Sequence, residues 1–165
     1  MRDGRHVRKR SIGCNRASGF TFVWVLAAIV ILSIGLAAIG PIWAEQARRE
    51  REQDLLRVGQ LYAHAIARYR ANAPGTLKPY PISLDQLLLD GRFAGTVRHL
   101  RRLYPDPLGA QRPWGVVRDA DGGIRGVYSQ STDMPLRREP LDLDGVSLPA
   151  AQRYDQWKFV TGPDA

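Results

Sequence analysis

The sequence predicts an α+β protein, in which one long N-terminal helix carries a small antiparallel sheet. Three observations predict this class. Residues 1–19 are basic and precede 25 residues without a charge, Phe20–Ala44. Apolar residues then recur every three or four positions up to residue 73, as on one face of a helix. From residue 74 onward, short apolar stretches alternate with Pro and Gly, which is typical of strands and turns.

The composition speaks against several classes of protein. The 165 residues include 24 Lys or Arg and 16 Asp or Glu, a formal net charge of +8. Residues 1–19 hold six of the basic and one of the acidic residues, so the rest carries +3 (18 − 15). This mild charge speaks against a nucleic-acid-binding protein. The single cysteine, Cys14, excludes an intramolecular disulfide, and the three distant histidines lack metal-ligand spacing.

Residues 20–44 are expected to form a membrane-spanning helix. As a helix they extend about 37 Å, more than a hydrocarbon core of about 30 Å. Trp24 and Trp43 stand near the two ends, where indole rings favour the membrane interface. Basic residues precede the segment, and balanced charges follow it over Glu45–Arg57. The positive-inside rule therefore predicts a cytoplasmic N-terminus and a C-terminal head on the other side.

The segment is too long for an ordinary secretory signal, whose apolar core has about 7–15 residues. Gly19-Phe20-Thr21-Phe22-Val23 instead resembles the prepilin peptidase site of type IV pilins and type II secretion pseudopilins. The resemblance implies cleavage after Gly19 and N-methylation of the new N-terminal Phe20. Pro41 stands where this family carries its helix-breaking proline, and a Gly-Pro pair (Gly40, Pro41) weakens a helix.

The resemblance also implies an organisation and a function. Residues 1–19 would be a leader, 20–44 a transmembrane and assembly helix, 45–73 its extramembrane continuation, and 74–165 a periplasmic head, together a pilin-like fold. The protein would be a structural subunit in the bacterial inner membrane, without catalytic activity or cofactor. Its partners would be prepilin peptidase, other pseudopilins or pilins, the inner-membrane assembly platform and membrane lipid. A single-pass membrane protein that does not polymerise, and whose periplasmic head binds a protein partner, remains an alternative.

Trp24 departs from the family pattern. Family members usually have a glutamate at this position, thought to meet the N-terminal amine of a neighbouring subunit. No other acidic residue lies within 20–44 to replace it, and burying an amine without a partner is costly. A missing glutamate is typical of the minor pseudopilin at the filament tip, so the resemblance implies a minor or tip component. Alternatively, Trp24 is only an interfacial anchor.

The extramembrane part of the helix and the head are predicted from local patterns. The helix presents an apolar stripe and an opposite polar face with a solvated His64, and it ends near residue 73. The stripe comprises Leu55, Val58, Tyr62, Ala65, Ile66 and Tyr69. The expected elements of the head are short helices at Leu84–Leu89 and Thr96–Leu103, a hairpin of Trp114–Val117 with Ile124–Ser129, a polar loop at Ser129–Pro149, and a strand within Tyr154–Val160.

Two further groups of residues are candidate sites. Asp142 and Asp144 offer oxygen ligands for calcium, but their stretch lacks a full ligand pattern and Arg137-Arg138 opposes cations. A solvated turn is the favoured interpretation, with no metal site expected. The basic run Arg98–Arg102 is interpreted as a solvated helix face rather than a DNA site. No catalytic constellation is recognisable, so an enzyme is not expected.

Overall fold

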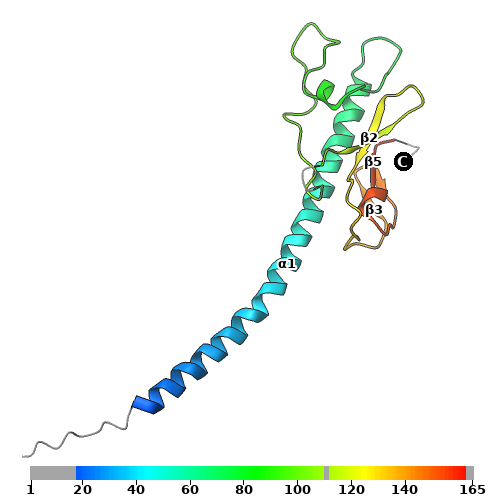
Figure 1. The fold of residues 1–165 in the computed structure, drawn as a ribbon. Helices are drawn as coiled ribbons and strands as arrows, with labels where there is room; N and C mark the ends of the chain where they lie inside the picture. The colour runs from blue at the N-terminus through cyan, green and yellow to red at the C-terminus, as the bar shows by residue number, and fades with distance from the viewer. Residues whose placement is uncertain (1–17, 110–111, 163–165) are drawn as a thin grey trace, which may run out of the picture. The chain divides into compact units, whose positions relative to one another are not determined.

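The computed structural model describes residues 18–109 and 112–162, without the side chains of 18–19 and 35–42. Its backbone divides into two compact units, Met1–Ala44 and Glu45–Ala165. The fold is α+β, with one long helix, two short 3-10 helices and small antiparallel sheets (Figure 1). Most of the predicted leader, including Cys14, lies outside the described residues.

Helix α1 comprises Ser18–Ala71, 54 residues, and ends two residues before the predicted end. In the first unit, every side chain from Phe20 to Ile34 is exposed. The helical backbone continues through Gly40 and Pro41. The helix is unbroken at this pair, and its predicted weakness there stays a prediction.

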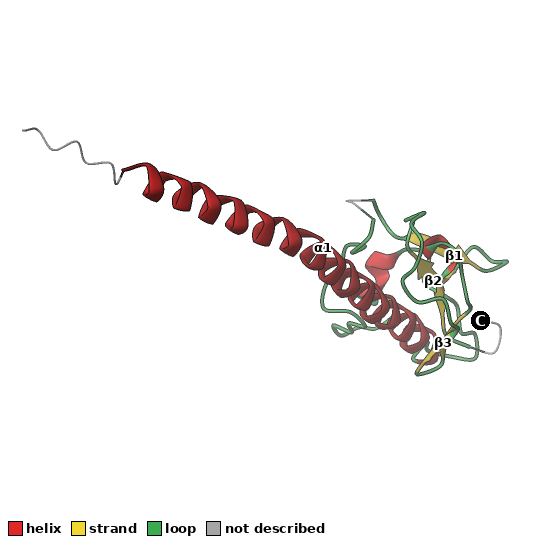
Figure 2. Ribbon diagram, turned by 90° about the horizontal axis from the view of Figure 1, so that it is seen from below, coloured by secondary structure: helices red, strands yellow, loops and turns green. Residues whose placement is uncertain are grey.

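In the second unit, the predicted apolar stripe of α1 is buried as expected. Its members pack against a layer of strands that lies on one side of the helix (Figure 2). Helix α1 and the ring of Phe159 approach each other closely at Gly59, where an added Cβ would lie 2.5 Å from ring carbons of Phe159. Only a residue without a side chain fits there, because the aromatic ring occupies that space. Helix and sheet therefore share one core.

The main sheet has three antiparallel strands in the order β1-β2-β5. They are β1 (Gly115–Arg118), β2 (Ile124–Tyr128) and β5 (Lys158–Val160). The first two form the predicted hairpin, with a register irregularity beside Arg118. At Gly126 an added Cβ would collide with the backbone carbonyl of Phe159 on β5, so the two strands approach each other closely there.

Aromatic side chains fill the space between helix and sheet. Tyr62 on α1 contacts Trp114, with ring centroids 5.5 Å apart, and Trp114 meets Phe159 edge-on at 6.3 Å. Tyr154 and Trp157 form another edge-on pair at 5.3 Å. Such pairs contribute beyond the area that they bury. The aromatic residues of the C-terminal segment thus complete the core begun by the helix.

Two predicted helices of the head are corrected. The first is only a single 3-10 turn, Leu84–Leu87. The second, Thr96–Leu103, does not form. The amides of His99 and Leu100 both donate to the carbonyl of Leu87, at 2.9 Å each. These tertiary hydrogen bonds replace the local bonds that a helix would need, so the propensity of the segment is overridden.

The predicted loop Ser129–Pro149 is also corrected, because it contains a second sheet. Strands β3 (Leu141–Leu143) and β4 (Val146–Leu148) form a hairpin around Asp144 and Gly145, both with positive φ. Asp and Gly tolerate left-handed backbone conformations, which is why the tight turn between β3 and β4 can close.

At the C-terminus, the predicted strand is shorter, since Tyr154–Gln156 is a 3-10 turn before β5.

Candidate functional site

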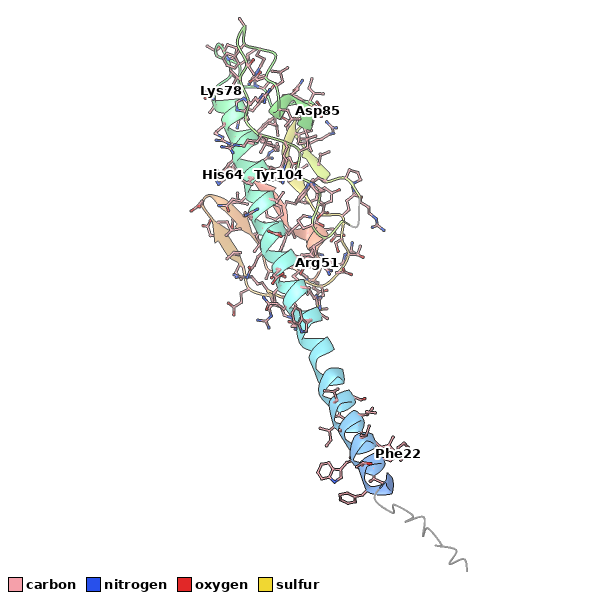
Figure 3. The ribbon with its side chains drawn as sticks, turned by 90° about the vertical axis from the view of Figure 1, so that its left-hand side faces the viewer. Phe22, Arg51, His64, Lys78, Asp85 and Tyr104 are labelled. Atoms are coloured by element: carbon pink, nitrogen blue, oxygen red, sulfur yellow. The ribbon has the colours of Figure 1, made fainter. Side chains whose placement is uncertain are left out.

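The most unusual surface in the described chain is the first half of α1. Fifteen consecutive residues, Phe20–Ile34, leave their side chains exposed, and nearly all of them are apolar. Phe20 is 72% and Trp24 64% exposed, and the side chain of Phe22 between them projects outward from the helix (Figure 3). Soluble proteins rarely expose a continuous apolar surface of this kind. This exposed apolar surface distinguishes the segment from the second unit, where the apolar stripe of α1 is buried.

The helix accommodates the hydroxyl of Ser33, one of the few polar groups of this segment. The hydroxyl of Ser33 donates to the carbonyl of Ile29 at 2.7 Å, one turn earlier. A backbone in helical conformation satisfies its own N–H and C=O groups. The segment can therefore leave water without stranding the Ser33 hydroxyl or the interior of its backbone.

The predicted processing residues lie at the start of this surface. Gly19 and Phe20 belong to the first turn of α1, which begins at Ser18. Trp24 follows Phe20 by four positions, so the two side chains share one face of the helix. Gly40 and Pro41 lie about 30 Å further along the same helix. The structure thus groups Phe20 with Trp24 and keeps the Gly-Pro pair apart from them.

The two weak calcium candidates are placed on the β3–β4 hairpin. Asp142 is exposed on β3, and Asp144 lies in the turn. A carboxylate oxygen of Asp144 accepts a hydrogen bond from the amide of Gln60 on α1, at 3.1 Å. Within residues 18–109 and 112–162, no group of three or more His, Cys, Asp or Glu side chains is placed to hold a metal ion. Asp144 therefore acts as a tether between the hairpin and the helix.

A buried acidic residue, Glu52, was missed by the sequence analysis. One carboxylate oxygen accepts hydrogen bonds from the hydroxyl of Tyr154 (2.6 Å) and the amide of Leu136 (2.7 Å). Burial, and then this carboxylate, raise the pKa of Tyr154 well above its ordinary value, so the hydroxyl stays protonated and donates. Glu52 stands three positions before Leu55, in line with the apolar stripe. That spacing was the available signal for a buried carboxylate.

A second buried carboxylate, Asp90, organises the loops at the other end of the head. Arg92 contacts it with two nitrogens, at 2.8 and 2.6 Å, and the Nε2 of His99 lies 3.1 Å away. The bidentate bond to Arg92 is the main cause that lowers the pKa of Asp90 far below its ordinary value. Arg92 also donates to the carbonyl of Tyr69 on α1 at 2.6 Å. The cluster fastens the loops to the helix.

His99 corrects the interpretation of the basic run as a solvated helix face. Its side chain is buried and its ring meets that of Tyr69 edge-on, with centroids 5.5 Å apart. The neighbouring Arg98 and Arg101 are exposed. His64, predicted to be solvated, is half-buried on α1. The run is thus a loop with one buried histidine between exposed arginines, and no local pattern in the sequence indicated the distant partner Asp90.

In comparisons with known proteins, no family model, curated protein or solved structure matches the chain. Among the described residues, no helix is both long enough and apolar enough to cross a membrane.

Proposed function

We propose that the protein is a pseudopilin-like structural subunit of a type II secretion or type IV pilus machine. The observation that carries the proposal is the contrast along helix α1. Its first half exposes an apolar surface, whereas its second half is buried against an α+β head. The prepilin-like sequence Gly19-Phe20-Thr21-Phe22-Val23 stands at the start of that apolar surface. A subunit that bundles through its N-terminal helix and displays its head needs both features.

The proposed mechanism is physical. Prepilin peptidase removes residues 1–19 from the inner-membrane precursor, and Phe20 becomes the methylated N-terminus. The uncharged segment 20–44 first lies in lipid and is then extracted by the assembly platform into a short periplasmic filament. Neighbouring apolar helices replace lipid tails there, so association depends on close packing rather than on leaving water. Gly40 and Pro41 supply the weak backbone position that such a transfer uses.

Trp24 supports a minor or tip position in that filament. An indole cannot neutralise the amine of a neighbouring N-terminus, and residues 20–44 contain no carboxylate that could. A tip subunit has no such neighbour above it, so the missing charge costs nothing there. Trp24→Glu would test this position, with increased cross-linking to neighbouring subunits as the expected result. Unchanged cross-linking and unchanged assembly would remove the basis for the tip position.

A second candidate is a single-pass inner-membrane protein whose periplasmic head binds a protein partner without any filament. The placement of Trp24 and Trp43 favours it. Both are exposed, at 64% and 72%, and they stand near the two ends of the uncharged segment. Indole rings at such positions anchor a membrane helix at the interface. Only the filament subunit requires removal of residues 1–19.

The mass of the N-terminal peptide distinguishes the two candidates. The full chain is produced with a prepilin peptidase, purified from membranes and digested for mass spectrometry. A terminus at methylated Phe20 is expected, and Gly19→Leu should abolish it, whereas the matched variant Gly13→Leu in the same leader should leave it intact. An unprocessed Met1 terminus in the wild type would overturn the filament subunit.

A further inference from the structure

A basic groove lies on the surface of the second unit, between helix α1 and the loop after residue 97. It has a cavity volume of about 690 Å³. Its cationic walls are Arg68 on the helix and Arg98 and Arg101 on the loop, while Leu61 and Tyr104 provide apolar surface. Tyr104 lies beside α1 in Figure 3. The groove therefore combines three guanidinium groups with an apolar strip.

The positive charge of this groove is not neutralised by the part of the chain that the structure describes. No carboxylate there lies within ion-pair distance of Arg68, Arg98 or Arg101. Arg68 donates to the carbonyl of His99, at 3.0 Å. The nearby carboxylate of Asp90 is buried and already engaged by Arg92 and His99. The groove thus offers unpaired guanidinium groups to an anionic partner.

The apolar side of the groove is rigidly supported. The hydroxyl of Tyr62 donates to the carbonyl of Tyr104 (3.0 Å) and accepts from its amide (2.8 Å). The indole of Trp114 donates to the same carbonyl at 2.9 Å. Leu61 remains 37% exposed on the helix face. Because these hydrogen bonds hold the backbone of Tyr104 against α1, this wall of the groove needs little ordering when a ligand binds.

We propose that this groove binds an acidic segment of a partner protein in which carboxylates alternate with apolar side chains. Guanidinium groups bind carboxylates through two parallel hydrogen bonds, and alternating side chains of an extended segment point to opposite sides. Such a segment directs carboxylates to Arg98 and Arg101, and apolar side chains to Leu61. Single-stranded nucleic acid fits less well, because binding it without sequence preference relies on aromatic rings that stack on the bases. The ring of Tyr104 is half-buried, with the guanidinium of Arg102 4.9 Å from its centroid.

The test uses the full chain in a non-ionic detergent and a fluorescein-labelled octapeptide of four Asp-Leu repeats. Fluorescence polarisation should detect saturable binding that weakens as salt is raised. The double variant Arg98→Glu/Arg101→Glu should weaken it at least about tenfold, or 1.4 kcal/mol. Arg98→Lys/Arg101→Lys, which keeps the charge but loses the planar fork, should weaken it by a smaller factor.

A matched control removes the same charge elsewhere on the head. Arg118→Glu/Arg138→Glu also exchanges two exposed arginines, and it should leave peptide binding unchanged. If both glutamate pairs weakened binding equally, the net charge of the protein would explain the affinity. That result would overturn the proposal that the peptide binds in the groove. Tighter binding of an eight-nucleotide oligothymidylate than of the Asp-Leu peptide would overturn the peptide assignment. The groove lies within residues 45–165, so the result does not depend on processing at Gly19.

Discussion

The two halves of helix α1 differ in what surrounds them, although they form one element. From Phe20 to Ile34 every side chain is exposed, whereas from Leu55 to Tyr69 a continuous stripe is buried in the head. The first half is apolar on all sides and has no charge. The second half alternates an apolar face with Arg, Glu and Gln. The apolar stripe of the second half is buried within the second unit, whereas the described side chains of the first half, Phe20–Ile34, are exposed.

This difference shows that the width of the apolar stripe on a helix indicates what the helix packs against. A stripe on one face fits one layer of the same protein, because the other face must remain in water. An apolar surface on all sides fits lipid or a bundle of similar helices. The head therefore supplies folding stability, and under the proposed function the first half of the helix supplies the surface for assembly.

Exchanging one phenylalanine in each region tests this division most directly. Phe159 on β5 is 0% exposed and Phe22 is 64% exposed. Phe159→Ala should lower the free energy of unfolding of the head by about 3–5 kcal/mol, since it removes buried surface and leaves a cavity. Phe22→Ala should change it by less than about 0.5 kcal/mol. Urea unfolding of the full chain in detergent, followed by near-ultraviolet circular dichroism, measures both. Equal losses would break the comparison.

The buried carboxylate of Asp90 should give the next largest effect. Asp90→Asn removes the charge that Arg92 contacts twice, and should cost about 1.5–3 kcal/mol at neutral pH. The pKa of Asp90 is lowered by folding, so its contribution is present above the unfolded pKa of about 3.9. The contribution is lost as the pH falls from there through the folded pKa.

Urea unfolding at several pH values measures this dependence. The difference in stability between wild type and Asp90→Asn should be constant above about pH 5 and shrink below pH 4. Asp85→Asn is the matched control, because Asp85 is an exposed carboxylate only five residues away. A constant difference down to pH 2 would show that the charge of Asp90 is not what stabilises the loops.

The features that the sequence predicted correctly depend on local or periodic signals. The stripe from Leu55 to Tyr69 follows the helical period, and the hairpin around residues 119–123 follows from its Asp and Gly turn residues. Each of these requires only the immediate sequence, because helix faces and tight turns are determined over a few residues.

The failures depend on contacts between distant segments. The segment Thr96–Leu103 has the composition of a helix, yet its amides bond to Leu87 and its histidine bonds to Asp90. The β3–β4 hairpin was read as a loop because its strands have only three residues each. For the candidate site, the processing residues were recognised by resemblance, and their function stays a prediction. The basic groove needed the fold, since Arg68 and Arg98 are 30 positions apart.

The hydrogen bond from Tyr154 to Glu52 allows a further test, at the other end of the head from Asp90. Tyr154→Phe leaves the buried carboxylate with one hydrogen bond fewer, and should cost about 1–3 kcal/mol. Folding raises the pKa of Tyr154, so its contribution is present below the unfolded pKa of about 10 and is lost as the pH rises above it. Wild type should therefore lose more stability than Tyr154→Phe between pH 9 and 11.

Thermal unfolding across that pH range measures the difference, with Tyr128→Phe as the control. Tyr128 is half-buried on β2, and no hydrogen bond of its hydroxyl is found among the described residues. An equal alkaline loss in Tyr154→Phe and wild type would show that the buried pair does not govern this end of the head.

The smallest effect is expected on the exposed face of α1, where the second unit begins. Arg49 and Glu45 form an ion pair at 3.3 Å with side chains 64% and 48% exposed. Such pairs contribute about 0.3–0.5 kcal/mol, so Arg49→Ala should barely change the unfolding midpoint. Arg92→Ala, which strands the buried carboxylate of Asp90, should cost about 3–5 kcal/mol in the same urea experiment. If Arg49→Ala instead cost more than about 1 kcal/mol, surface charge as well as burial would stabilise this half of the helix. The two halves of α1 would then differ less in the interactions that stabilise them than the contrast between their apolar surfaces indicates.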